Sequence, residues 1–378
     1  MKFDMGVEIN DQIYLIEHFS RCFMSVHIPS GDVRIESYLP WKYTQSKIDM
    51  LLLKKGILIT SMSIDHFLIY DFIKQQMTIL KPQRMKADDC GYYFSNVLVN
   101  QDELIVLPFR DKEIKRYGMH GELKIKDSQW IRNIFGKCEY DSKMYENNIR
   151  RDSACISRNW LFFSLVYGGE NYLCKYSLDK INGSCEIIYY SKDVPIRGVY
   201  AYSDKILFRR IFEDKTEIVL LDLYSNEQRT IKIDNPAMFE EDVYGDKDYI
   251  RASFKNMILK IEEKNSRADQ SIYDFEEADT YIANGILFNV AENKILKEDK
   301  GSIKEYSIEK VNNKIKSSGL YQEGYRKDFQ EQCFREGKYK LKNLVKYLDE
   351  DPYNKVEKGN FIKNKNIGEE IWMEIISV

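Results

Sequence analysis

The sequence contains little proline, histidine or cysteine. Its 378 residues include 7 prolines, 4 histidines and 7 cysteines. The cysteines are scattered and form no CxxC pair, a pattern that argues against a zinc site or a disulfide framework and favours reduced thiols. The longest apolar runs, such as Trp160–Val166, stop far short of the ~20 residues of a membrane helix, and the first residues show no signal-peptide pattern. We therefore expect a cytoplasmic protein with no membrane partner.

Motifs for catalysis, metal binding and nucleotide binding are also missing. The sequence has no GxSxG elbow, no HExxH pair, no GxxxxGK(S/T) phosphate loop and no GxGxxG after a strand. We expect the four histidines at surface turns, and we interpret Asp88-Asp89-Cys90 as an acidic turn rather than a metal site. The net charge of −3, with both signs interspersed, gives no reason to expect nucleic acid as a partner. These absences predict no catalytic residue, no metal and no cofactor.

The stretch Val199–Ile233 contains four short apolar-rich runs. They read VYAYS, KILFRRIFE, EIVLLDLYS and QRTIKI, and the polar residues between them are those that turns favour. Each run is rich in the β-branched, aromatic and aliphatic residues that fit a pleated surface. The pattern predicts an antiparallel meander of four strands.

Similar units recur along the chain at a regular spacing. The second predicted strand of each unit contains one residue of the set Ile13, Ile57, Leu104, Leu161, Ile206, Ile250 and Ile286. Successive members of this set lie 44, 47, 57, 45, 44 and 36 residues apart, with a mean of about 45. A period of about 40–50 residues with four strands per unit is typical of propellers, whereas solenoids of helix pairs need a 3.6-residue apolar spacing that these segments lack.

The arrangement resembles the seven-bladed β-propeller superfold over residues 3–308. The resemblance rests on strand count and period, because the sequence carries no WD40, Kelch, YWTD or Asp-box signature. It implies an all-β protein, a seven-bladed β-propeller of four-stranded antiparallel blades. The segment Phe3–Ile9 either begins the first blade or completes the last one and so closes the ring. Because propellers include enzymes, binding modules and scaffolds alike, the resemblance implies no single function.

After about Glu309 the apolar spacing changes from two residues to a helical period. Apolar residues between Tyr325 and Leu348, and again between Ile367 and Ile375, fall on one face of a helix. We therefore divide the chain into a β-propeller, residues 1–308, and a C-terminal α-helical extension, residues 309–378. The extension is expected to pack on the propeller, and a tail that docks a partner is the alternative.

Aromatic and arginine residues gather in the connections between the predicted blades. The connection Ser128–Asp152 is 25 residues long, and such long insertions in a compact domain are usually functional or disordered. Aromatic and arginine side chains are those that binding hot spots use. The predicted binding residues of this face are Trp41, Tyr43, Arg84, Lys86, Trp130, Arg132, Tyr140, Tyr145, Arg150 and Arg151. A structural role, in which the tryptophans only cover the blade ends, stays open.

These observations favour a non-enzymatic binding or scaffold protein that presents one propeller face to a protein, a peptide or a glycan. The alternative is a glycan-acting enzyme, because glycosidases use a pair of carboxylates. The candidate carboxylates of the same face are Glu240, Glu241, Asp242, Glu276, Glu277 and Asp279. The sequence does not show whether two of them face each other, so both functions stay open.

Overall fold

The computed structural model describes residues between 3 and 307 with internal gaps. The gaps are residues 10, 18–21, 28–29, 31, 42–47, 89–90, 137–147, 180–182, 203, 214, 234–242, 246–249, 255–256, 263–266, 273–279, 284–285, 290–293 and 300–301. Side chains are described for most positions as far as Lys232, whereas for the strands after residue 242 the description is of the backbone.

Among the described residues, the strands form seven antiparallel sheets of four strands each. The first four sheets consist of β1 (Phe3–Ile9), β2 (Gln12–Glu17), β3 (Cys22–His27) and β4 (Val33–Tyr38); β5 (Ile48–Leu53), β6 (Gly56–Ser61), β7 (Phe67–Asp71) and β8 (Gln76–Leu80); β9 (Asn96–Asn100), β10 (Glu103–Leu107), β11 (Ile114–Gly118) and β12 (Leu123–Asp127); and β13 (Asn148–Ser157), β14 (Trp160–Tyr167), β15 (Glu170–Ser177) and β16 (Cys185–Ser191).

The remaining three sheets follow the same order. They consist of β17 (Ile196–Tyr202), β18 (Lys205–Ile211), β19 (Thr216–Asp222) and β20 (Gln228–Ile233); β21 (Val243–Gly245), β22 (Ile250–Phe254), β23 (Met257–Glu262) and β24 (Arg267–Ile272); and β25 (Thr280–Ala283), β26 (Ile286–Asn289), β27 (Lys294–Asp299) and β28 (Ser302–Ser307). Each of the seven evenly spaced apolar residues of the sequence, from Ile13 to Ile286, lies in the second strand of a sheet. The predicted repeat is therefore confirmed.

Among the described side chains, second strands such as β6 and β14 are buried on both faces. All six residues of β6 are buried, as are six of the eight residues of β14. The fourth strand β8 differs, because three of its five residues are exposed. A near-continuous apolar run fits a strand that neighbouring sheets cover from both sides, and a mixed run fits an outer strand.

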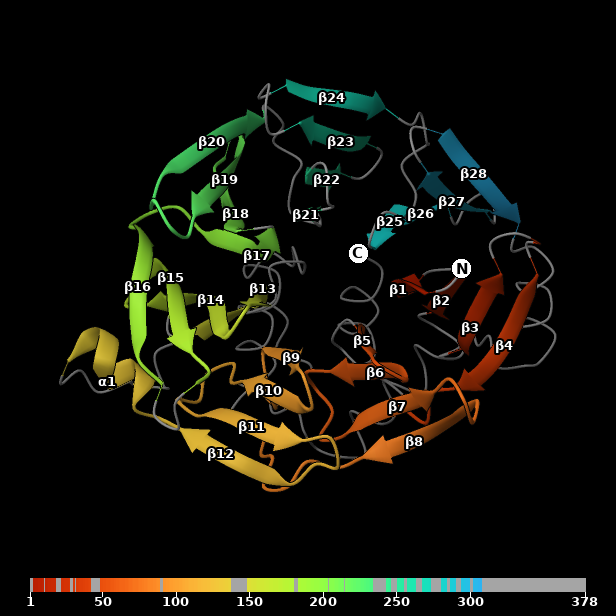
Figure 1. Ribbon diagram of the computed structural model, residues 1–378, viewed down its shortest axis with the longest axis horizontal. Helices are drawn as coiled ribbons and strands as arrows, with labels where there is room; N and C mark the ends of the chain where they lie inside the picture. The colour runs from red at the N-terminus through yellow and green to blue at the C-terminus, as the bar shows by residue number, and fades with distance from the viewer. Residues whose placement is uncertain are drawn as a thin grey trace, which may run out of the picture. The chain divides into compact units, whose positions relative to one another are not determined.

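The sheets follow one another around a common centre, with the first strand of each sheet innermost (Figure 1). First strands of successive sheets are in contact from β1 to β21, and β25 contacts β1. This is the arrangement of a β-propeller, so the predicted fold class is confirmed. That seven blades complete the ring stays a prediction, because the side chains that would pack the last two sheets lie outside the described residues.

The closure in which the first strand completes the last blade is not the one adopted. β1 pairs with β2 in antiparallel register, from Phe3 opposite Glu17 to Ile9 opposite Gln12. The strands β25–β28 form a sheet of their own, without β1. The first and last sheets therefore meet through contacts between their innermost strands rather than by sharing a strand.

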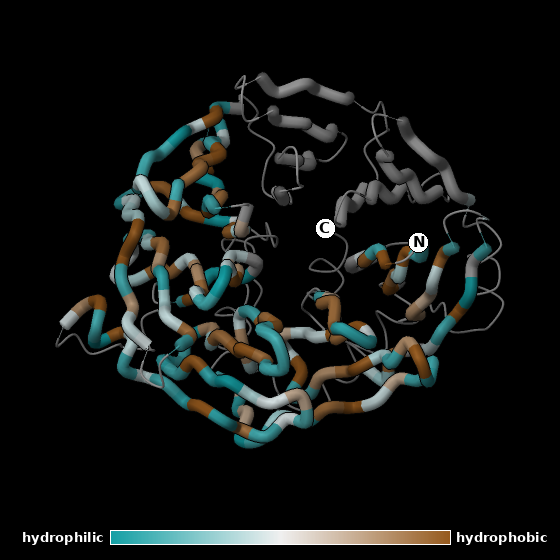
Figure 2. Tube along the Cα trace, viewed as in Figure 1, coloured by the Kyte–Doolittle hydropathy of each residue, from teal (hydrophilic) through white to brown (hydrophobic). Residues whose placement is uncertain are grey.

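The hydrophobic core is divided among the spaces between neighbouring sheets. Phe23, Trp41 and Tyr70 belong to one buried cluster that joins the first two sheets, and Trp130 and Phe163 belong to another that joins the third and fourth. Hydrophobic residues recur along every coloured sheet in Figure 2. Packing of sheet on sheet, repeated around the centre, therefore holds the fold together.

The predicted C-terminal extension lies outside the described residues. The last described strand ends at Ser307, and the compact unit that contains the sheets extends to Asn313. The predicted boundary at residue 308 and the predicted helices of residues 309–378 therefore stay predictions. In the part of the chain that the structure describes, no helix is both long and apolar enough to cross a membrane.

Because two buried tyrosines have raised pKa values, we expect the free energy of unfolding to fall at alkaline pH. Burial raises the pKa of Tyr176, whose hydroxyl donates to Asp127 Oδ2 at 2.7 Å, and raises the pKa of Tyr117 to about 12. In the unfolded chain both hydroxyls ionise near pH 10. The folded state then holds more protons than the unfolded state, so we expect the free energy of unfolding to hold below about pH 10 and to fall above it. Urea unfolding between pH 8 and pH 11 tests this, and an unchanged free energy would contradict it.

Candidate functional site

The strand directions place the predicted binding face at one end of the sheets. First strands begin at this end and second strands finish there, because the two strands run antiparallel. We call it the connection end. The links between sheets, including the described residues 81–88 and 128–136, also start or finish here. Those predicted residues that the structure describes therefore share one end of the fold, although only some of them lie together.

The two predicted tryptophans are buried in the core. Trp41 is 4% exposed, and its indole N–H donates to His66 Nε2 at 2.8 Å. Trp130 is fully buried, donates its indole N–H to the carbonyl oxygen of Lys112 at 2.7 Å and packs edge-on against Phe163. Neither ring is available on the surface. Both tryptophans therefore have the structural role that the sequence left open. Their binding role stays a prediction.

The 25-residue connection is not a single loop. It contains the short helix α1 (Trp130–Phe135) and the first residues of β13. Arg132, on α1, and Arg84, in the link between the second and third sheets, are both exposed. Tyr43, Tyr140 and Tyr145 lie outside the described residues. Removing Ser128–Asp152 would therefore delete core residues and half a strand rather than a detachable binding loop.

Arg150 and Arg151 lie where β13 departs from regular pairing. The register between β13 and β14 shifts between Ile149 and Ala154, and such bulges often re-aim side chains near functional sites. Arg150 Nη2 donates to Asn171 Oδ1 at 3.2 Å. Arg151 Nη2 lies 3.8 Å from Asp49 Oδ2. The bulge thus directs two adjacent guanidinium groups to different neighbours at the connection end.

The next inner strand has a matching bulge. The register between β17 and β18 shifts between Arg197 and Tyr200, and Gly198 adopts a φ of 57°. The Gly198 N–H donates to Ser153 Oγ at 3.0 Å, so the bulges of β13 and β17 are joined by a hydrogen bond. The two strands are neighbours around the centre (Figure 1).

Arg209 lies across the glycine of this second bulge. It is only 7% exposed and sits opposite Arg197 in the register of β17 and β18. A Cβ atom at position 198 would lie 2.9 Å from Arg209 Nε, so glycine is needed both for the positive φ and for the space the guanidinium occupies. We call Arg150, Arg151, Arg197 and Arg209 the arginine cluster.

The pKa of Arg150 shows how burial and neighbouring positive charge act within the arginine cluster. Its pKa is lowered to about 10, chiefly by burial and then by the positive charge of Arg197. Its Nε atom is buried and has no hydrogen-bond partner in the described part of the chain. Arg151, Arg197 and Arg209 also interact with other neighbouring groups. A partly desolvated positive charge with a free N–H is a suitable donor to an anion, because charge-assisted hydrogen bonds strengthen away from water.

Two of the four arginines of the cluster were predicted from the sequence. Arg150 and Arg151 were predicted because they end a long connection, whereas Arg197 and Arg209 were missed because they lie inside predicted strands. A signal was present in the run KILFRRIF, where Arg209 interrupts the second strand of a sheet at a position expected to be apolar. A charge in a doubly covered strand needs a polar or ionic reason to be there.

The described residues provide no metal site. No group of three or more histidine, cysteine, aspartate or glutamate residues gathers within the described ranges. The arginine cluster offers guanidinium donors and a serine hydroxyl, Ser153 Oγ, that already accepts from Gly198 and donates to the carbonyl oxygen of Arg151 at 3.1 Å. The chemistry of these groups is that of hydrogen-bond donors to an anion.

No family model matches the chain, and no curated protein matches it in sequence. Solved structures do resemble it. Hydrazine synthase of Kuenenia stuttgartiensis is 8% identical over 79% of this chain and 93% of that chain, with a TM-score of 0.51. A puromycin-hydrolyzing peptidase of Mycobacterium tuberculosis is 9% identical, with a TM-score of 0.50 over 81% of this chain and 53% of that one. The Dos1 propeller is 8% identical, with a TM-score of 0.47 over 76% of this chain and 78% of that chain.

The chain has a β-propeller fold. At these identities the similarity extends to the fold alone, and the chain spans about half the length of the peptidase chain it resembles. The function of this propeller must therefore be argued from its own residues.

Proposed function

We propose that this propeller is a non-enzymatic binding protein whose arginine cluster holds an anionic segment of a partner protein. The observation that carries the proposal is that four arginines stand at or beside two hydrogen-bonded bulges on three neighbouring strands, with Arg150 near enough to Arg197 to feel its charge. Guanidinium groups match carboxylate and phosphate oxygens in shape as well as charge, and they are the usual means of recognising either group.

Part of the desolvation that binding normally requires has already occurred in the folded protein. Burial has lowered the pKa of Arg150, so an incoming anion meets a positive charge that water already screens poorly. Arg150 is also held by its bond to Asn171, and Asn96 Nδ2 donates to its carbonyl oxygen at 2.9 Å. A preorganised group loses less conformational entropy when a partner arrives, which favours affinity.

The glycan-acting alternative receives no support from the described residues. All six of its candidate carboxylates, in 240–242 and in 276, 277 and 279, lie outside them. The arginine cluster itself contains donors to an anion but no pair of carboxylates. A binding role is therefore the function that these side chains favour.

Fluorescence anisotropy with labelled peptides tests the proposal. We expect ten-residue peptides of glutamate, or of alternating glycine and phosphoserine, to bind the wild-type protein and a ten-residue lysine peptide not to bind. Comparing the two acidic peptides distinguishes carboxylate from phosphate recognition. Replacing Arg150→Gln or Arg197→Gln should weaken acidic binding about tenfold or more, because each change removes a charge-assisted contact.

The matched control lies at the opposite end of the same strand pair. Arg158 follows β13 in the turn away from the connection end, where its Nη2 is 2.7 Å from Asp204 Oδ1 and both side chains are exposed. Arg158→Gln makes the same chemical change and should leave the affinity as it is. Equal affinities for all three variants, or no binding of either acidic peptide to wild type, would refute the proposal.

A further inference from the structure

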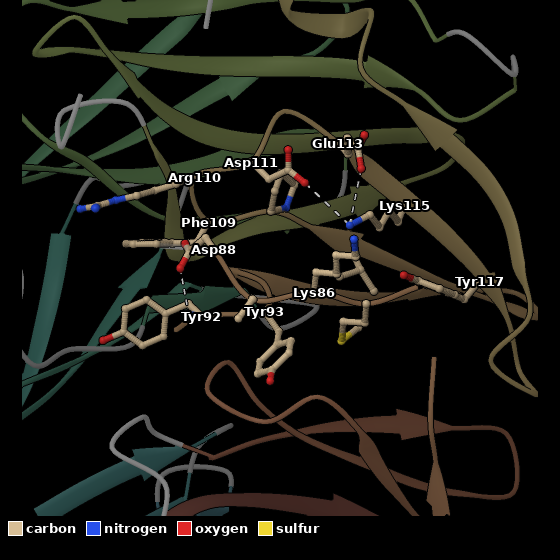
Figure 3. A pocket seen from close by; sticks show the side chains of 14 residues that line it. Lys86, Asp88, Tyr92, Tyr93, Phe109, Arg110, Asp111, Glu113, Lys115 and Tyr117 are labelled. Atoms are coloured by element: carbon tan, nitrogen blue, oxygen red, sulfur yellow. Dashed lines mark hydrogen bonds and ion pairs between the residues drawn. The ribbon is translucent and has the colours of Figure 1, made fainter. Parts of the chain in front are cut away.

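A separate pocket opens in the third sheet. It is bounded by residues 85–88, 92 and 93 of the link between the second and third sheets, by the turn between β10 and β11, and by residues of β11. Its volume is about 260 Å³, which suits a ligand of about one ring. Figure 3 shows its side chains, with Arg110 directed away from Lys115 and Tyr117. None of the four residues of the arginine cluster lines the pocket.

One side of the pocket is an aromatic wall. The rings of Tyr92 and Phe109 meet edge to face, with centroids 5.3 Å apart. The loop that carries Tyr92 is fixed by Asp88, whose Oδ1 accepts the Tyr92 backbone N–H at 3.0 Å. The guanidinium of Arg110 lies over the Phe109 ring, 5.5 Å from its centroid, so the wall offers C–H groups the ring surface that Arg110 leaves uncovered.

The other side of the pocket carries charges that balance each other. Lys115 Nζ lies 3.8 Å from Asp111 Oδ2 and 3.7 Å from Glu113 Oε2, and Glu113 also pairs with Lys126. Lys86 adds an exposed amine that points toward the same region in Figure 3. An anionic ligand would lie beside Asp111 and Glu113, and a cationic ligand beside the two amines. The balance favours a neutral molecule that can both donate and accept hydrogen bonds.

Tyr117 supplies an unused hydroxyl. Its side chain is fully buried, and its hydroxyl has no hydrogen-bond partner in the described part of the chain. The hydroxyl lies on the side of the ring that faces Lys86 (Figure 3). A buried polar group without a partner is destabilising, so natural proteins rarely keep one without a reason. A ligand hydroxyl in the pocket would provide the missing bond.

We propose that this pocket binds a neutral sugar ring, free or at the end of a glycan. The sugar hydroxyls donate to Asp111 and Glu113 and accept from Lys86, while one of them pairs with Tyr117. The apolar face of the ring packs on Tyr92 and Phe109. This combination of a mixed polar edge with an apolar face is the chemistry of a pyranose, and it does not depend on the anionic partner of the arginine cluster.

Isothermal titration with a panel of ligands tests the proposal. The panel contains glucose, galactose, mannose, N-acetylglucosamine and their methyl glycosides, with acetate and ethylamine as charged comparators. We expect at least one neutral sugar to bind and neither comparator to do so. A free sugar that binds more tightly than its methyl glycoside indicates a free ligand, and equal binding indicates a terminal unit. Binding of no sugar, or tighter binding of a charged comparator, would overturn the proposal.

Two tyrosine variants separate a ligand contact from a structural role. Tyr117→Phe removes a hydroxyl without a partner, so the melting temperature should hold or rise while sugar affinity falls about tenfold. Tyr176→Phe removes a hydroxyl that donates to Asp127, so the melting temperature should fall while sugar affinity holds. Arg197→Gln should leave sugar binding unchanged, which keeps this test independent of the anionic partner. A Tyr117→Phe variant that binds the sugar as wild type does would refute the proposed contact.

Discussion

Replacing Trp130→Ala is expected to lower the free energy of unfolding by about 3–5 kcal/mol, the range for a fully buried large aromatic. The indole is fully buried, packs edge-on against Phe163 with centroids 5.3 Å apart, and gives its N–H to the carbonyl of Lys112. Truncation leaves a cavity between the third and fourth sheets and an unpaired carbonyl. Urea unfolding followed by tryptophan fluorescence and circular dichroism measures the change.

Trp160 provides the comparison for this variant. It is partly exposed, and its ring lies 4.2 Å from Lys175 Nζ in a cation–π contact. Trp160→Ala should lower the free energy of unfolding much less, by about 1 kcal/mol, because it removes the cation–π contact and some packing. If Trp130→Ala instead kept its stability and lost only partner binding, Trp130 would be a binding residue rather than a core residue, contrary to this account.

Replacing Gly198→Ala is expected to destabilise the protein by about 1–3 kcal/mol and to weaken acidic-peptide binding at the same time. The φ of 57° is strained for alanine, and the new Cβ would lie 2.9 Å from Arg209 Nε. The guanidinium must then move, and with it one edge of the arginine cluster. Urea unfolding and peptide anisotropy measured on the same sample report the two effects.

Gly168→Ala separates backbone strain from displacement of the guanidinium. Gly168 has nearly the same φ, 59°, in the turn between β14 and β15, but no atom lies within 4 Å of the position its Cβ would take. We expect Gly168→Ala to lose stability through strain alone and to bind the acidic peptide as wild type does. Equal losses of binding in both glycine variants would show that the position of Arg209 does not matter.

The order of the strands could be predicted from the sequence because an apolar run recurs at the second strand of each sheet. Second strands with described side chains, such as β6 and β14, are buried on both faces, so Ile57 and Leu161 stand in apolar runs that recur about every 45 residues. Closure was not predictable, because Phe3–Ile9 has the composition of a strand wherever it pairs. Only the register with β2 shows that it begins the first sheet.

The site was only partly predictable, for a different reason. Residue type suggested that Trp41 and Trp130 bind a partner, but an indole serves a core as well as an interface, and only the structure shows that both rings are buried. Arg197 and Arg209 come together through a bulge at Gly198 that shifts the register, and no spacing along the chain reveals such a shift. The unpaired hydroxyl of Tyr117 likewise emerges only from packing.

The salt dependence of acidic-peptide binding tests the central claim most directly. If guanidinium charge holds the partner, the dissociation constant of wild type should rise steeply between 50 and 300 mM sodium chloride, because salt screens ionic contacts. The Arg150→Gln/Arg197→Gln double variant should bind weakly with a much shallower dependence. The same slope in both proteins would mean that the anion binds elsewhere, and the assignment of the arginine cluster as the binding site would be wrong.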